Sequence, residues 1–338
     1  MKAIGLTQYL PVEDEKSLQD IELPEPEASG HDLLVKVKAV SVNPVDTKIR
    51  APKDQVEDTP RILGWDAAGE VVAVGQQVEN FTAGDLVYYA GDVTRAGSNC
   101  EFQLVDERIV GRKPASLSFA EAAALPLTSI TAWEALFDRL QISVQGDDAG
   151  KSILIIGGAG GVGSIAIQLA KQLAKLNVIA TASRPESQQW CLDRGADSVI
   201  NHHQPLDEAL AALDKTQVDY ILCLNSTNQH WPAMTKLIRP QGKICSIVDA
   251  SNVDLSLLKS KSATFVWEFM FTRSMYKTPD MIEQQRLLNA VAELIDNGVL
   301  VTTMNTLLHP INAENLRKAH KIIEQGKTIG KLVLSDWP

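Results

Sequence analysis

A glycine-rich turn at residues 157–163 is the stretch whose residue types and spacing point most directly to chemistry. Gly158, Gly160 and Gly163 match G-x-G-x-x-G between an apolar run, 153–156, and a run with helical spacing. The first glycine permits a sharp bend, the second lets a pyrophosphate approach the backbone, and the third lets helix and strand pack closely. The pattern predicts a dinucleotide site formed by Gly158, Ala159, Gly160, Gly161, Val162 and Gly163. The alternative is a turn used only for packing.

The end of the next expected strand, 178–183, indicates which dinucleotide binds. Enzymes that use NAD place an acidic residue there, about 20 residues past the turn, to bind the ribose 2′-hydroxyl. Here the strand ends in Ser183 and Arg184, with no acid. A hydroxyl and a guanidinium suit a 2′-phosphate, so these residues predict NADPH as the cofactor. Arg184 as a solvated residue at a helix start is the alternative.

Composition limits the class of protein. The 338 residues suggest two domains, and the formal charge of −10 disfavours nucleic-acid binding. No apolar run approaches the ~20 residues of a membrane span, and the N-terminus does not resemble a signal peptide, so a cytoplasmic location is expected. The four cysteines form no C-x-x-C pair, and Cys223 and Cys245 lie in apolar runs typical of a core.

Two regions with different sequence patterns must position these residues. Residues 1–112 read as short strands, such as 33–42, 67–75 and 85–91, whereas apolar strands alternate with helices from residue 151 onward. Ser118 and Glu121 form a capping-box pair before a helix that Pro126 interrupts. We therefore expect an α/β protein with a β-rich domain and a doubly wound parallel sheet. Further helices are expected at 164–176, 186–194, 206–214, 229–239, 280–297 and 313–325, and a final strand at 330–334 returns to the first domain.

Together these segments resemble the medium-chain dehydrogenase/reductase superfamily, and within it the quinone oxidoreductase branch, closest to the zinc-type alcohol dehydrogenase-like proteins. The resemblance covers nearly the whole chain and is carried by NPVDTKIR (43–50), GWDAAGEVVAVG (64–75), GDLVYY (84–89), AAALPLTSITAWEAL (122–136), the glycine turn and GKLVL (330–334). It implies a GroES-like catalytic domain, 1–127 completed by 280–338, and a Rossmann domain, 128–279. It also implies a homodimer through an edge strand at 263–271, where Trp267, Phe269 and Phe271 are expected on one face.

The resemblance also bears on metal binding. The zinc enzymes of the superfamily hold a catalytic ion with two cysteines and a histidine. The positions that match those ligands here are Asn43, Trp65 and the pair Leu127-Thr128. The segment that matches the structural zinc lobe contains only Cys100, and His202-His203 read as a surface loop pair. No metal site is expected.

The resemblance implies roles for residues of the first domain. Asn43 is the expected donor to the substrate oxygen, and Asp46 orients its loop. Lys48 stands where related quinone reductases often have a tyrosine; it either donates a proton or is a surface lysine. Thr128 aligns with a threonine near the nicotinamide, and it also suits a helix cap.

Two further residues are cofactor contacts by resemblance. His202 matches a tyrosine that lies against the adenosine in related reductases, and Lys331 is a second candidate. The expected activity is hydride transfer from NADPH to a quinone or an α,β-unsaturated carbonyl, without metal. A zinc-dependent alcohol dehydrogenase and a non-catalytic NADPH-binding protein are the alternatives.

Overall fold

The computed structural model describes residues 1–338, which divide into two compact units. Unit 1 comprises Met1–Ile130 and Phe271–Pro338, and unit 2 comprises Thr131–Met270. The sequence places the two boundaries at 127/128 and 279/280. None of the helices combines the length and apolar composition that a membrane span requires.

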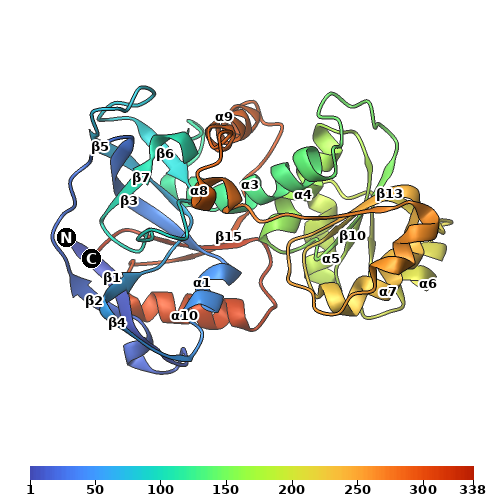
Figure 1. The fold of residues 1–338 in the computed structure, drawn as a ribbon, viewed down its shortest axis with the longest axis horizontal. Coiled ribbons are helices and arrows are strands. Elements are labelled where there is room, and N and C mark those ends of the chain that lie inside the picture. The colour runs from blue at the N-terminus through green and yellow to red at the C-terminus, as the bar shows by residue number, and fades with distance from the viewer. The chain divides into compact units, whose positions relative to one another are not determined.

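Unit 1 is built on two antiparallel-rich sheets (Figure 1). One has the order β2-β1-β4, and the other has the order β15-β16-β3-β5-β6-β8 with β7 also paired to β3. The elements are β1 Lys2–Tyr9, η1 Glu15–Ser17, β2 Gln19–Glu22, β3 Asp32–Val42, α1 Pro44–Arg50, β4 Lys53–Ile62, β5 Ala67–Val74, β6 Leu86–Tyr89, β7 Phe102–Asp106, η2 Glu107–Ile109, β8 Val110–Arg112, α2 Phe119–Ala123, α8 Thr272–Tyr276, α9 Glu283–Asp296, β15 Met304–Leu308, α10 Ala313–Glu324 and β16 Lys331–Ser335. The helix α3, Pro126–Trp133, begins in unit 1 and ends in unit 2.

The last strand, β16, joins the first domain as expected. It pairs antiparallel with β3, with Leu332 opposite Val42, and parallel with β15. The capping box is also confirmed, since the Ser118 hydroxyl accepts the Glu121 N–H and the Glu121 carboxylate accepts the Ser118 N–H. Residues 280 to 338 therefore belong structurally with the N-terminal strands.

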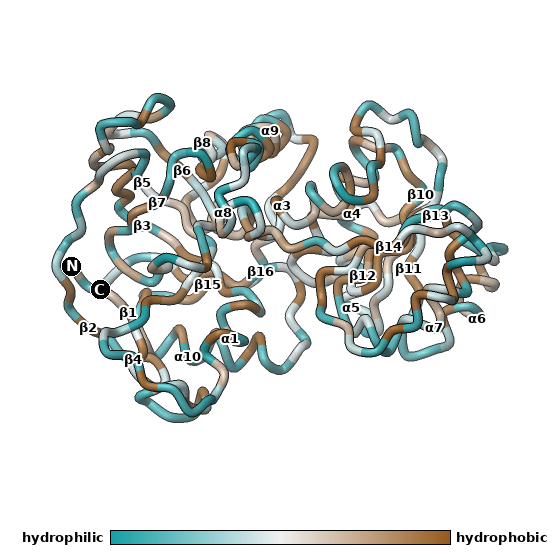
Figure 2. Tube along the Cα trace, viewed as in Figure 1, coloured by the Kyte–Doolittle hydropathy of each residue, from teal (hydrophilic) through white to brown (hydrophobic).

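Unit 2 is a doubly wound sheet of six parallel strands in the order β11-β10-β9-β12-β13-β14. Apolar residues run along its strands, and hydrophilic residues mark the connecting turns (Figure 2). Its elements are η3 Glu134–Arg139, a π-helical turn, then β9 Ser152–Ile156, α4 Gly161–Gln172, β10 Asn177–Thr181, α5 Pro185–Asp193, β11 Ser198–Ile200, α6 Leu206–Ala211, β12 Val218–Cys223, α7 Thr227–Leu237, β13 Ile238–Ser246, η4 Leu255–Lys261 and β14 Thr264–Trp267.

The strand order determines where a ligand can meet this sheet. The chain runs outward from β9 through β10 to β11, then returns to β12 on the other side of β9 and continues to β14. The switch point lies between β9 and β12, and doubly wound sheets bind their ligands at the carboxyl ends of the strands beside such a point. The glycine turn follows β9 directly.

One expected feature of β14 is wrong. The strand ends at Trp267, so the two-residue alternation does not continue to Phe271. Trp267 and Phe269 are half exposed, but Phe271 is buried and its ring packs edge-on against Trp65. The chain leaves the sheet at Glu268, whose buried carboxylate pairs with Arg139 of η3.

Candidate functional site

The glycine turn between β9 and α4 divides its tasks differently from the expectation. The sharp bend falls on Gly157, which has a φ of +90°, a conformation that side chains with a Cβ rarely adopt. The next glycine, Gly158, is required by packing instead, because a Cβ there would lie 2.7 Å from that of Ala180 on β10. The Gly157 and Gly158 N–H groups donate to the Thr181 hydroxyl and carbonyl, and so tie the turn to β10.

Gly160 distinguishes a binding turn from a packing turn. A Cβ on Gly163 would lie 2.5 Å from the carbonyl oxygens of Gly157 and Gly158, so close packing explains that glycine. A Cβ on Gly160 would meet nothing closer than 3.6 Å, and its φ of −73° suits any residue. Packing therefore does not explain Gly160. The space over it lies at the start of the 12-residue helix α4, whose first N–H groups have no intrahelical acceptors. The turn fits a dinucleotide pyrophosphate.

Ser183 and Arg184 follow β10 at the same edge of the sheet, and both are partly exposed. Arg184 is the N-cap residue of α5, and its N–H donates to the Ser187 hydroxyl. Its guanidinium lies 3.2 Å from the Glu186 carboxylate. Arg184 therefore begins a helix and also carries a partly exposed cation beside the carboxyl end of β10.

His202 lies in the turn after β11, with its ring centroid 4.7 Å from that of His203. Burial lowers its pKa, and His203 and His230 lower it further. Its Nδ1 is buried without a hydrogen-bond partner. The lowered pKa favours the neutral ring, which is partly accessible at the carboxyl edge of the sheet.

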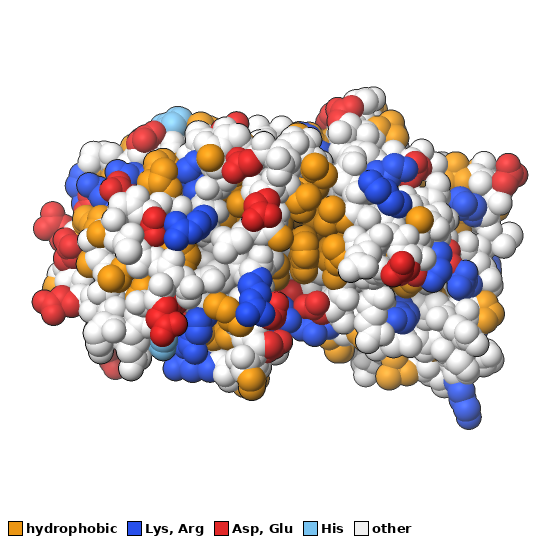
Figure 3. All heavy atoms as spheres, turned by 90° about the horizontal axis from the view of Figure 1, so that it is seen from above, with side chains coloured by type: hydrophobic (Ala, Val, Ile, Leu, Met, Phe, Trp, Pro, Cys, Tyr) orange, Lys and Arg blue, Asp and Glu red, His pale blue; other side chains and the backbone are white.

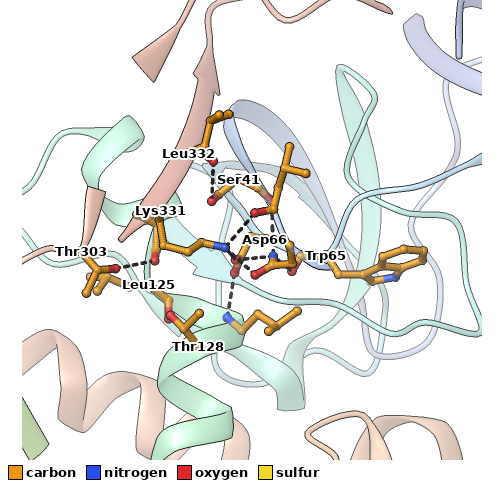
Figure 4. A network of polar contacts seen from close by, with 12 residues as sticks. Ser41, Trp65, Asp66, Leu125, Thr128, Thr303, Lys331 and Leu332 are labelled. Atoms are coloured by element: carbon orange, nitrogen blue, oxygen red, sulfur yellow. Dashed lines mark hydrogen bonds and ion pairs between the residues drawn. The ribbon is translucent and has the colours of Figure 1, made fainter. Parts of the chain in front are cut away.

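A buried polar network occupies the end of β3 in unit 1 (Figure 4). The Lys331 ammonium, from the first residue of β16, lies 2.9 Å from the Asp66 carboxylate and also donates to the Asn43 side-chain oxygen and the Val42 carbonyl. The Asn43 amide donates to Asp66 at 2.8 Å. Asn43, Asp66 and Lys331 are at most 3% exposed. The structure thus brings together two residues assigned to different tasks, Asn43 to substrate and Lys331 to cofactor.

Asp46 and Lys48 lie on the short helix α1, and only Asp46 joins the network. Its carboxylate accepts the Asn43 N–H at 2.5 Å, and its other oxygen, Oδ1, is buried without a partner. Burial raises the pKa of Asp46 to about 7, although the Asn43 N–H and Lys331 oppose the rise. Lys48 is exposed. The Asp46 carboxyl therefore titrates close to neutral pH.

Thr128 lies in the first turn of α3 and is 2% exposed. Its hydroxyl donates to the Leu125 carbonyl at 3.1 Å and accepts no backbone N–H, so Thr128 lies inside the first turn of α3 and is not its cap. The neighbouring Leu127 N–H donates to Asp66 at 2.7 Å, so α3 is attached to the Asn43–Asp66–Lys331 network.

The donor set of this network does not fit zinc. Asn43 stands beside a carboxylate that already holds a lysine ammonium, and Trp65 is buried with its indole N–H donated to the Asp92 carbonyl. No group of three or more His, Cys, Asp or Glu side chains has the geometry to hold a metal ion, and all four cysteines are buried thiols. Zinc sites use thiolate, imidazole and carboxylate ligands, and this network offers only two carboxyl groups, the lysine-paired Asp66 and Asp46, which is bonded to the Asn43 N–H.

Sequence reasoning missed a second buried charge cluster, in unit 2. The Arg139 guanidinium lies 2.8 Å from Glu268 and 3.5 Å from Glu134, and both carboxyl groups are at most 2% exposed. Burial, then repulsion from Glu134, raises the pKa of Glu268 to about 9. Sequence reasoning also missed the ionic role of Asp66. Its position inside the apolar run 63–74 was a usable signal, since a charge in such a run needs a partner.

Family models match two long segments of the chain. Residues 29–133 match the alcohol dehydrogenase GroES-like domain, and residues 194–334 match the zinc-binding dehydrogenase family. A zinc-type alcohol dehydrogenase-like protein of Staphylococcus aureus is 44% identical over 99% of this chain and 100% of its own length. The 2-methylene-furan-3-one reductase of Solanum lycopersicum is 37% identical over 74% of this chain and 63% of its own length.

Solved structures show the same architecture. A Rhizobium etli protein assigned to the zinc-dependent alcohol dehydrogenases is 52% identical, with a TM-score of 0.95 over 100% of this chain and 98% of its own. The Escherichia coli quinone oxidoreductase, solved with NADPH, is 25% identical, with a TM-score of 0.82 over 99% and 100% of the two chains. This family binds a nicotinamide cofactor, which agrees with the glycine turn of unit 2. The chain is an oxidoreductase of the medium-chain dehydrogenase/reductase superfamily and belongs with its zinc-type alcohol dehydrogenase-like members.

Proposed function

We propose that this protein uses NADPH to reduce a quinone or an α,β-unsaturated carbonyl compound, without a metal ion. The observation that carries the cofactor choice is the pair Ser183-Arg184 at the carboxyl end of β10, where an NAD enzyme has an acid. The partly exposed guanidinium can exchange its contact with Glu186 for a 2′-phosphate, because a surface ion pair is weak. The E. coli neighbour with NADPH supports the same choice.

The acceptor class follows from the donor set of unit 1. When bound, the reduced nicotinamide supplies a hydride. An electron-poor ring or β-carbon accepts it without a Lewis acid, because the negative charge spreads onto oxygen, which then takes a proton from water. The Asn43 amide is our candidate donor to that oxygen, since one of its hydrogens has only long contacts, 3.4 Å and 3.5 Å, to Trp65 and Ser41 carbonyls. Similarity to a furanone reductase and to a quinone-oxidoreductase homologue supports these acceptors.

The remaining assignments belong to the same proposal. Gly158 to Gly163 bind the pyrophosphate, His202 borders the adenosine, and Thr128 lies toward the nicotinamide. We also propose a homodimer through β14, because this edge strand has no neighbour on one side and exposes Trp267. On the face drawn in Figure 3, acidic and basic side chains are interspersed, and the formal charge of −10 also disfavours nucleic acid as a partner.

Stopped-flow oxidation of NADPH with a panel of quinones and enones tests the activity. We expect turnover that a chelator leaves unchanged. Tight NADPH binding without turnover of any acceptor would contradict the enzyme assignment. Activity lost with a chelator and restored by Zn²⁺ would favour the zinc-dependent alcohol dehydrogenase.

Replacing Arg184 tests the cofactor choice. Arg184→Ala should weaken NADPH binding by roughly tenfold or more and leave NADH binding nearly unchanged, because only NADPH carries the 2′-phosphate. Glu186→Gln is the matched control, since it removes the carboxylate that lies 3.2 Å from the guanidinium and should not weaken NADPH binding. An Arg184→Ala variant that kept its full preference for NADPH would refute the role of the guanidinium.

A further inference from the structure

The Lys331 ammonium has a complete set of partners inside unit 1. An ammonium has three hydrogens to donate. Here it has three oxygen acceptors: the Asn43 side chain, the Asp66 carboxylate and the Val42 carbonyl. The side chain is only 3% exposed. A fully satisfied and buried ammonium has no hydrogen left for a cofactor phosphate.

The backbone around Lys331 explains why its ammonium lies there. As the first residue of β16, Lys331 donates its N–H to the Thr303 carbonyl at 2.8 Å, and the Thr303 hydroxyl bonds to the Ala124 carbonyl. Next to it, the Leu332 carbonyl accepts the Ser41 hydroxyl at 2.9 Å, beside the β3–β16 pairing (Figure 4). These bonds fix the base of the lysine, so its stem reaches the Asn43 loop from a rigid strand.

We propose that Lys331 is a buried cation that holds the Asn43 side chain in one orientation by pairing with Asp66 and has no role at the cofactor. It is a positioning residue rather than a cofactor contact. The Lys331 charge fixes the Asn43 amide, because its oxygen faces the ammonium and its nitrogen must then face Asp66. The same ammonium opposes the burial that raises the pKa of Asp46 and of Asp66. The inference about catalysis rests on the proposed reductase function, whereas the inference about ionisation does not.

Three variants test the proposal. Lys331→Met keeps an apolar stem and removes the charge. Lys331→Met with Asp66→Asn removes both charges of the pair. Lys318→Met, at an exposed position on α10 in the same unit, is the control for a lysine-to-methionine change. Each is measured for NADPH dissociation constant, kcat against pH, and melting temperature against pH.

Lys331→Met should lose roughly 5–10 °C of melting temperature, because it leaves Asp66 buried without its cation, and the double variant should recover most of the loss. Without the ammonium the carboxyl groups ionise at higher pH, so the pH dependence of kcat and of melting temperature should move up by about one unit. NADPH affinity should change by less than about twofold, since the ammonium does not contact the cofactor. Lys318→Met should match the wild type in all three.

Two results would overturn the proposal. A Lys331→Met variant that binds NADPH at least tenfold more weakly, with unchanged pH dependence, would make Lys331 a cofactor contact. A double variant with a melting temperature no higher than that of Lys331→Met, or one that fails to fold as Lys331→Met does, would show that the Lys331–Asp66 ion pair does not hold the network together. If no acceptor is reduced, the reductase function fails, but the melting-temperature series still decides the charge relation between Lys331 and its carboxyl groups.

Discussion

Gly160 offers the sharpest test of the cofactor site, because packing places no demand on it. In Gly160→Ala the new methyl would meet nothing closer than 3.6 Å, and the backbone φ of −73° suits alanine. The lower backbone entropy of the unfolded alanine chain and the poorer N-cap offset each other, so the free energy of unfolding should change by less than about 1 kcal/mol. Gly163→Ala is the matched control, because its methyl would lie 2.5 Å from two carbonyl oxygens and should cost about 1–3 kcal/mol or more.

NADPH binding should be weakened in Gly160→Ala even though the substitution does not disturb packing. A phosphate oxygen that accepts an N–H bond lies about 2.9 Å from the backbone nitrogen, inside the contact distance of an added methyl. We therefore expect Gly160→Ala to weaken NADPH binding at least tenfold, about 1.4 kcal/mol, with normal stability. Fluorescence titration with NADPH and chemical denaturation measure the two quantities. A Gly160→Ala protein with wild-type NADPH affinity would refute the placement of the pyrophosphate over this residue.

Three further outcomes are expected. Glu268 has a folded pKa of about 9, above its unfolded value, so its contribution to stability is complete below about pH 4 and is lost as the pH rises toward 9. Glu268→Gln should remove a slope of up to about 1.4 kcal/mol per pH unit, and parallel denaturation curves for the two proteins from pH 5 to 9 would contradict this. Trp267→Lys should shift the protein toward monomers in analytical ultracentrifugation, because it places a charge on the open edge of β14; an unchanged mass would exclude this edge as the interface. Elemental analysis of the purified protein should find well below one Zn²⁺ ion per chain, since no cluster of His, Cys, Asp or Glu side chains offers the tetrahedral ligands that zinc requires.

Local patterns in the sequence were sufficient for most of the elements. The alternation of apolar strands and helices after residue 151 predicts the parallel sheet, because each element must bury one face. The glycine turn was predictable for the same reason: its spacing encodes a strand, a bend and a helix start. Two details differed from the local pattern. The sharp bend lies at Gly157 and not at Gly158, and β14 ends at Trp267, so Phe271 does not share a strand face with Trp267.

The charge networks were decided only by the tertiary structure. Asp66 and Lys331 are 265 residues apart. Glu134 lies on a π-helical turn, whereas Glu268 follows the end of the edge strand β14. Sequence spacing says nothing about such pairs, because their distance is set by how β16 pairs with β3 and how η3 packs on β14. The sequence by itself determined the family, the parallel sheet and the glycine turn, since these depend on local spacing. Only the folded chain decided that the Lys331 ammonium lies beside Asn43 rather than open to solvent, because burial and pairing arise when distant strands meet.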